Sequence, residues 1–224
     1  MSFVIFPPSP FQTKGKKLTR AIFSFLAAIS IVRALVANSI ATVYVIPVPA
    51  FEKFAEVQRK SGTLLSFLTK IMSMFSTILK HPVFPRQWVQ MNLLVCKAAL
   101  KLCRVLKSIL DTQFSGATFN KTIWTDFFNL TSSLLTAEAL QLETFSPTKE
   151  KLILRSYSDM RLEGNTLLKS AWEGLGTVQA QFVPSLVGNF VEVSMTQHKV
   201  IRTTATNIIY SMMEKQYNNN QSLQ

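Results

Sequence analysis

Large apolar side chains recur at steps of three and four residues through most of the chain, from about residue 63 onward. That spacing places them on one face of a helix, and it first predicts a helix over 63–79. Its expected inward residues are Leu64, Leu65, Leu68, Ile71, Met72, Phe75, Ile78 and Leu79. The segment HPVFPRQW (81–88) carries two prolines and predicts a connector.

The same period predicts two further helices, over about 87–111 and 123–135, joined by a loop at 111–120. The first would bury Val95, Ala99, Leu102, Leu106, Ile109 and Leu110. The second would bury Ile123, Trp124, Phe127, Phe128, Thr131, Leu134 and Leu135. An aromatic stripe of this kind indicates a packed core in preference to a ligand site.

Helix start and stop signals divide the remainder of the chain. Ser146 is the expected N-cap of one helix, with Pro147 at its first position. Asp159 is expected to begin the next helix, and Gly174 or Gly176 to end it. Its expected buried stripe is Leu162, Leu167, Leu168, Ala171, Trp172 and Leu175.

Pro184 is expected to open another helical segment, and a last helix follows over about 198–215. The segment after Pro184 would turn Leu186, Val187, Phe190 and Val191 inward. The last helix would bury Ile201, Ala205, Ile208, Ile209, Met212 and Met213. Residues 218–224 are expected to form a polar tail.

Helices of about 12 to 24 residues with short connectors, and no strand alternation, predict an all-α protein. We expect an irregular armadillo-like stack of antiparallel helices over 61–217. A single helical bundle is the alternative, and no strict repeat period separates the two.

Residues 1–60 differ from the rest. The basic segment KGKKLTR (14–20) precedes an apolar run over 21–48, an order typical of a membrane anchor. Arg33 near the centre of that run would cost roughly 2.5–3.5 kcal/mol on insertion, which the surrounding apolar residues offset. Three interpretations stay open: a membrane span, a helix buried in protein, or a stretch that is not native to the mature protein.

Charge is distributed unevenly. The chain carries a net charge of +12, and residues 1–121 hold sixteen Lys and Arg against three acidic residues. Lys97, Lys101, Arg104 and Lys107 form a basic stripe opposite the apolar face of the 87–111 helix. This stripe is a candidate anion-binding surface, alone or with the 14–20 cluster. The simpler interpretation is a solvated face, or an imbalance that a missing part of a larger protein would offset.

The residues give no sign of catalysis. Cys96 and Cys103 lie on one helical face, too far apart for a disulfide, and read as buried apolar residues. His81 and His198 have no partners at the spacing of a triad or a metal site, so both are expected to be ordinary surface histidines. No phosphate-binding loop or paired carboxylates occur, and we expect no cofactor, no metal and no enzyme.

Several extended segments resemble the DOCK (dedicator of cytokinesis) family of guanine-nucleotide exchange factors. They are FPRQWVQM (84–91), LTAEALQLETFS (135–146), YSDMR (157–161), AWEGLGTVQAQFVPSLVGNFVEVSM (171–195) and VIRTTATNIIYSMMEKQY (200–217). The resemblance is to the helical region between the family's C2-like and catalytic domains, and residues 1–60 lie outside it. LQLETFS and FVPSLVG are most similar to the subgroups that act on Rac.

The resemblance implies a non-catalytic scaffold fragment in small-GTPase signalling, located in the cytoplasm or at a membrane. Rac or Rho GTPases would then be partners only through domains outside this chain, alongside the other domains of the full protein and an acidic membrane surface. No nucleic-acid partner is expected. The alternatives are a small helical protein anchored through 21–48 and an anion-binding helical module.

Overall fold

The computed structural model of the protein describes residues 29–221, with side chains up to residue 218. Those residues contain helices and no strand, which confirms the all-α prediction. The chain divides into two units, Met1–Ser39 and Ile40–Gln224. The basic segment 14–20, the start of the apolar run at 21–28, and residues 222–224 lie outside the described residues.

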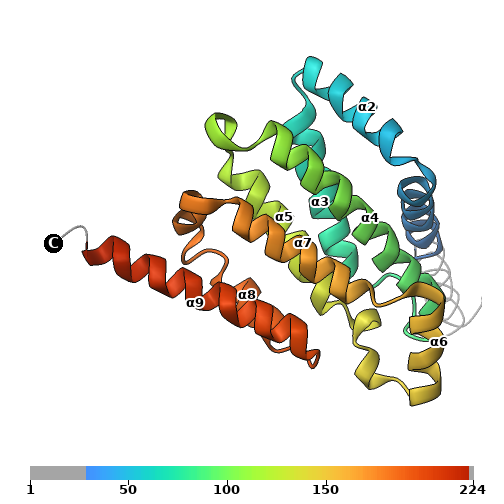
Figure 1. Ribbon diagram of the computed structural model, residues 1–224. Helices are drawn as coiled ribbons and strands as arrows, with labels where there is room; N and C mark the ends of the chain where they lie inside the picture. Colours follow the sequence, from blue (N-terminus) through green and yellow to red (C-terminus); the bar gives the residue numbers. More distant parts are fainter. Residues whose placement is uncertain (1–28, 222–224) are drawn as a thin grey trace, which may run out of the picture. The chain divides into compact units, whose positions relative to one another are not determined.

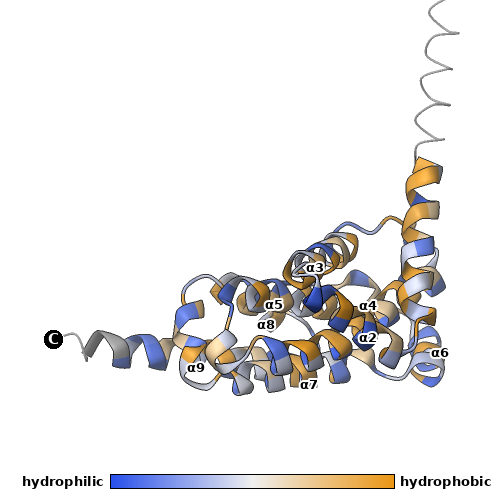
Figure 2. Ribbon diagram, turned by 90° about the horizontal axis from the view of Figure 1, so that it is seen from above, coloured by the Kyte–Doolittle hydropathy of each residue, from blue (hydrophilic) through white to orange (hydrophobic). Residues whose placement is uncertain are grey.

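Helix α1 (Ile29–Val45) contains the described part of the first unit. Ile31, Val32 and Leu35 are at least half exposed, and Figure 2 shows this stretch coloured mainly as hydrophobic. Among residues 29–221 no helix is long and apolar enough by itself to cross a membrane. Helices α1 and α2 (Val48–Lys60) satisfy that test only as a pair, and the pair is bent at a break between them.

The second unit is an irregular stack of helices, as the apolar spacing predicted (Figure 1). The α-helices that follow α2 are α3 (Leu64–Lys80), α4 (Val89–Gln113), α5 (Lys121–Thr136), α6 (Pro147–Tyr157), α7 (Met160–Gly174), α8 (Val187–Ser194) and α9 (Lys199–Gln221). Short 3-10 helices lie between them: η1 (Gly116–Thr118), η2 (Glu138–Leu140), η3 (Leu142–Thr144) and η4 (Gly176–Phe182).

Helix α5 lies at the centre of this stack and packs against α3, α4, α7 and α8. All seven residues that the sequence assigned to its core are buried. The ring of Phe128 lies about 6 Å from five aromatic rings, those of Trp124, Phe127, Trp172, Phe182 and Phe190. Centroid separations of this size are favourable for aromatic pairs, so the aromatic side chains of α5 form a packed core, as the sequence indicated.

Glycine allows α7 to approach α5 closely. A Cβ atom on Gly164 would lie 3.2 Å from Cδ2 of Leu135, closer than most carbon contacts in proteins. The missing side chain therefore sets the spacing of these two helices, in a position that the sequence pattern did not single out.

Four residues predicted to point inward are exposed. Leu65, Leu162, Val191 and Met213 have between 37% and 58% of their surface in solvent. Each lies beside the buried face of its helix and not on it: Met213 follows the buried Met212, and one residue along a helix turns the side chain by about 100°. Apolar neighbours of a core position were thus mistaken for core positions.

Helix ends follow the predicted signals with three differences. Pro147 opens α6, but the Ser146 side chain makes no capping hydrogen bond. Helix α7 ends at Gly174, and Gly176 adopts a φ of 52° just beyond it. Pro184 was expected to start the next helix, but α8 begins at Val187, and η4 lies between it and α7 and buries Phe182. Helix α9 continues to Gln221, through the first residues of the expected polar tail.

Candidate functional site

The basic stripe of α4 faces other parts of the protein and not solvent alone. Lys97 lies over the rings of Tyr44 and Tyr157, at 5.7 and 5.6 Å from their centroids. At these distances the ammonium group is attracted to the face of each ring. Arg104 pairs with Glu163 on α7, and Lys107 pairs with Asp111 one turn further along α4.

Lys101 caps the C-terminal end of α1. Its ammonium group donates hydrogen bonds to the backbone oxygens of Tyr44, at 2.7 Å, and Ile46, at 2.5 Å. The last carbonyls of a helix have no partner within the helix, and they carry the negative end of its dipole. A lysine in this position satisfies both needs, so it holds the end of α1 against α4.

The four cations of the stripe therefore have intramolecular partners from α1, α6, α7 and α4 itself. The simpler interpretation of a solvated face is only partly right, because just 15% of the Lys107 side chain is exposed. Anion binding by the stripe stays a prediction.

A second charged cluster was not anticipated. Arg161, near the start of α7, is 3% exposed, and its guanidinium donates to both carboxylate oxygens of Glu143 at 2.8 Å. It also contacts both oxygens of Asp159, at 3.0 and 3.1 Å. Burial alone would lower the pKa of Arg161, but these hydrogen bonds and charges outweigh it and raise the pKa. The arginine thus stays charged and ties η3 to α7.

Asp159 has two further roles in this cluster. Its Oδ1 accepts a hydrogen bond from the backbone N–H of Arg161 at 3.0 Å, so Asp159 is the N-cap of α7, the helix that it was expected to begin. Its Oδ2 lies 3.6 Å from Nε2 of His198, the residue before α9. His198 is only 18% exposed at its side chain, so the expectation of an ordinary surface histidine was wrong here.

The cluster left a weak signal in the sequence. Asp159 was expected to begin the helix, and Arg161 stands directly before the expected apolar stripe, where a charge requires a partner. Glu143 lies 18 residues away in the chain, across α6, and its proximity arises only from the fold. Sequence spacing therefore could not pair the two.

The remaining candidates for reactivity lie in the core. Cys96 and Cys103 are free and buried, as predicted, and burial raises the pKa of both thiols to about 12. A nucleophilic cysteine requires the opposite shift. Within residues 29–218, no three His, Cys, Asp or Glu side chains gather in a way that would hold a metal ion.

These features describe a helical core beside a buried arginine that two carboxylates pair, and comparison with known proteins supplies the family. A family model described as the dedicator of cytokinesis (DOCK) TPR region matches residues 14–224. The chain belongs to the DOCK family. The match begins at residue 14, whereas the sequence segments had placed the DOCK-like part from residue 61 onward.

Individual DOCK proteins are similar over a shorter stretch. Dedicator of cytokinesis protein 3 of Mus musculus and of Homo sapiens is 30% identical over 164 residues, which is 73% of this chain. Dedicator of cytokinesis protein 4 of Homo sapiens is 30% identical over 151 residues, or 67% of the chain. The chain spans 8% of the length of these relatives.

Proposed function

We propose that this DOCK-family chain is a non-catalytic helical scaffold of a guanine-nucleotide exchange factor for Rac- or Rho-type GTPases, acting in cytoplasmic signalling. The observation that carries the proposal is the aromatic core around α5, in a region that matches the helical segment of the family. Contact with the GTPase would be made by other domains of a longer protein, whose relative positions this stack would hold.

The physical argument rests on rigidity. Phe128, Phe182 and Phe190 are each fully buried, and removing a side chain of that size from water stabilises a fold by roughly 1.5–3 kcal/mol. Interlocked rings drawn from α5, η4 and α8 resist bending between those elements. A rigid segment of this kind can hold other domains at fixed relative positions, and it needs no reacting group to do so.

Nucleotide release from Rac tests the proposal. Rac loaded with a fluorescent GDP analogue would be mixed with the purified chain, and release followed over time. We expect the rate to equal that of Rac alone at every chain concentration, while EDTA, which removes magnesium, accelerates release in the same assay. A rate that rises with chain concentration would contradict the non-catalytic assignment.

Membrane association is a second candidate, supported by the exposed apolar residues Ile31, Val32 and Leu35 of α1. The basic segment 14–20 and the α4 stripe would add attraction to anionic lipid, although the stripe contributes less because its cations have internal partners. Carbonate extraction and flotation with acidic liposomes distinguish the modes: an anchor survives both carbonate and salt, whereas surface attraction weakens steeply with salt. A chain that neither floats nor sediments with membranes refutes both.

A further inference from the structure

A cavity of about 320 Å³ opens beside the connector between α3 and α4. Its walls are mainly apolar and come from the end of α3, the connector, the start of α4 and η2. The wall residues used below are Phe84, Val89, Ala139 and Phe145, with Arg86 and Glu138 also lining the cavity. All of these belong to the second unit of the chain.

The size and lining suit a single bulky group. Cavities that bind ligands begin at about 300 Å³ and are lined mostly by apolar side chains with a few polar groups. At about 320 Å³ this cavity lies at the lower end of that range, which is room for one bulky aromatic or branched aliphatic side chain. Water in an apolar cavity finds few hydrogen-bond partners, so an apolar group that replaces it is favoured.

The surroundings of the cavity indicate a ligand larger than the cavity itself. Trp88, 51% exposed, stacks on the cavity residue Phe84 with ring centroids 6.3 Å apart. The Arg86 side chain is 83% exposed and pairs with Glu138 at 2.7 Å. Tryptophan and arginine are the residues most often found at the energetic centre of protein interfaces. Trp88 does not line the cavity, so a small molecule bound inside it would leave this ring uncovered, whereas a polypeptide segment would cover it.

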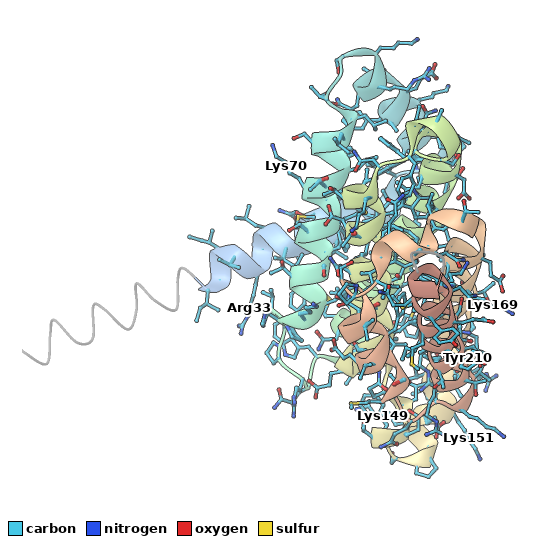
Figure 3. All side chains as sticks on the ribbon, turned by 90° about the vertical axis from the view of Figure 1, so that its left-hand side faces the viewer. Arg33, Lys70, Lys149, Lys151, Lys169 and Tyr210 are labelled. Atoms are coloured by element: carbon cyan, nitrogen blue, oxygen red, sulfur yellow. The ribbon has the colours of Figure 1, made fainter. Side chains whose placement is uncertain are left out.

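Charge defines the segment further. Lys149 on α6, labelled in Figure 3, lies 4.4 Å from the ring centroid of Phe145, which lines the cavity. Arg86 is already paired with Glu138, so the further positive charge beside the cavity comes from Lys149. Glu143, the next acidic residue along the chain, is occupied by Arg161. The excess of positive charge favours a partner with carboxylates beside its apolar group.

We propose that this cavity is a docking site for a protein segment that inserts one bulky uncharged side chain, aromatic or branched aliphatic, flanked by Asp or Glu. The inserted side chain fills the space between Phe84, Val89 and Phe145. Its flanking carboxylates face Arg86 and Lys149, and its backbone covers Trp88. The site is separate from the scaffold role, since it is a surface for a partner and does not depend on which domains adjoin the stack.

A random-peptide display library, selected on the purified chain, tests the proposal without a known partner. Enriched peptides should share one bulky uncharged residue with acidic neighbours. Their affinity, measured by fluorescence polarisation, should fall at least about tenfold in Ala139→Trp, which fills the cavity, and in Trp88→Ala, which removes the exposed ring. Val57→Ala, an exposed apolar residue on α2, is the matched control and should leave affinity unchanged.

The remaining outcomes overturn the proposal. They are the absence of enriched peptides, enrichment of basic peptides, and peptides that bind Trp88→Ala and the unmodified chain equally. N-acetyltryptophanamide alone is the small-molecule arm; if it binds as tightly as the peptides, the cavity is a small-ligand site and not a docking site. Circular dichroism checks that Ala139→Trp is folded, and Trp88→Ala, a surface change, keeps the test decisive if it is not.

Discussion

The charged side chain of Arg161 is almost fully buried, and the carboxylates of Glu143 and Asp159 compensate its charge. Replacing Arg161 with alanine would leave Glu143 and Asp159 partly buried without their cation, so we expect a loss of about 3–5 kcal/mol of unfolding free energy. Urea denaturation measures it. Arg104→Ala is the control, because the Arg104–Glu163 pair is about half exposed and should cost at most about 1 kcal/mol. Equal losses in the two variants would contradict a structural role for the buried cluster.

Asp126 on α5 offers a test that depends on pH. Burial raises the pKa of its carboxyl above the ordinary value of 3.8, and a hydrogen bond from Thr69 opposes the shift only in part. The folded state therefore binds this proton more tightly than the unfolded state, and the wild type loses stability as pH rises from 3.8 through the raised pKa.

Asp126→Asn removes that loss because the amide does not ionise. We expect the variant to be more stable than the wild type at neutral pH, with the difference shrinking toward zero below pH 3.8. Thermal unfolding from acidic to neutral pH measures it. Glu173→Gln, whose side chain is 63% exposed, should change stability little at any pH. A gain for Asp126→Asn that is largest in acid would refute the assigned cause.

At the scale of the helix, the end of α7 depends on one backbone conformation. Gly176 has a φ of 52°, a region in which a side chain costs about 1–2 kcal/mol, although open space surrounds the position. Gly176→Ala should lower the unfolding free energy by about that amount. Gly174→Ala, inside the last turn and also in open space, should be neutral or slightly stabilising. If both substitutions cost the same, backbone strain is not the cause.

The helices themselves could be predicted because each contributes an apolar stripe whose period survives in the sequence. The burial of polar residues on α5 could not be predicted from the sequence, because it arises from neighbours that pack on several sides of this one helix. Ser133 is 2% exposed, yet its hydroxyl has hydrogen-bond partners. It donates to the backbone oxygen of Asn129, and its Oγ lies 2.9 Å from Oγ of Ser76. The stripe of α4 illustrates the same limit, because its partners Tyr44 and Glu163 lie far away in the chain.

For the whole molecule, the aromatic core predicts that α5, α7 and α8 lose protection together. Phe128→Ala removes a ring that contacts Trp172 on α7 and Phe190 on α8, and should cost about 3–5 kcal/mol. Hydrogen exchange should then accelerate in all three helices. Phe54→Ala, at a 45% exposed ring that contacts Phe67 on α3, should affect only α2 and α3, by about 1 kcal/mol. Acceleration confined to α5 would show that the core does not couple its neighbours.

Cys103 is a natural reporter of how tightly α4 is held in the stack. Its thiol is fully enclosed in the middle of α4, and burial raises its pKa to about 12. Alkylating reagents attack the thiolate, so modification must wait until α4 separates from its neighbours. The alkylation rate of this sulfur atom consequently reports how often α4 opens from the stack, and no label has to be introduced into the protein beforehand.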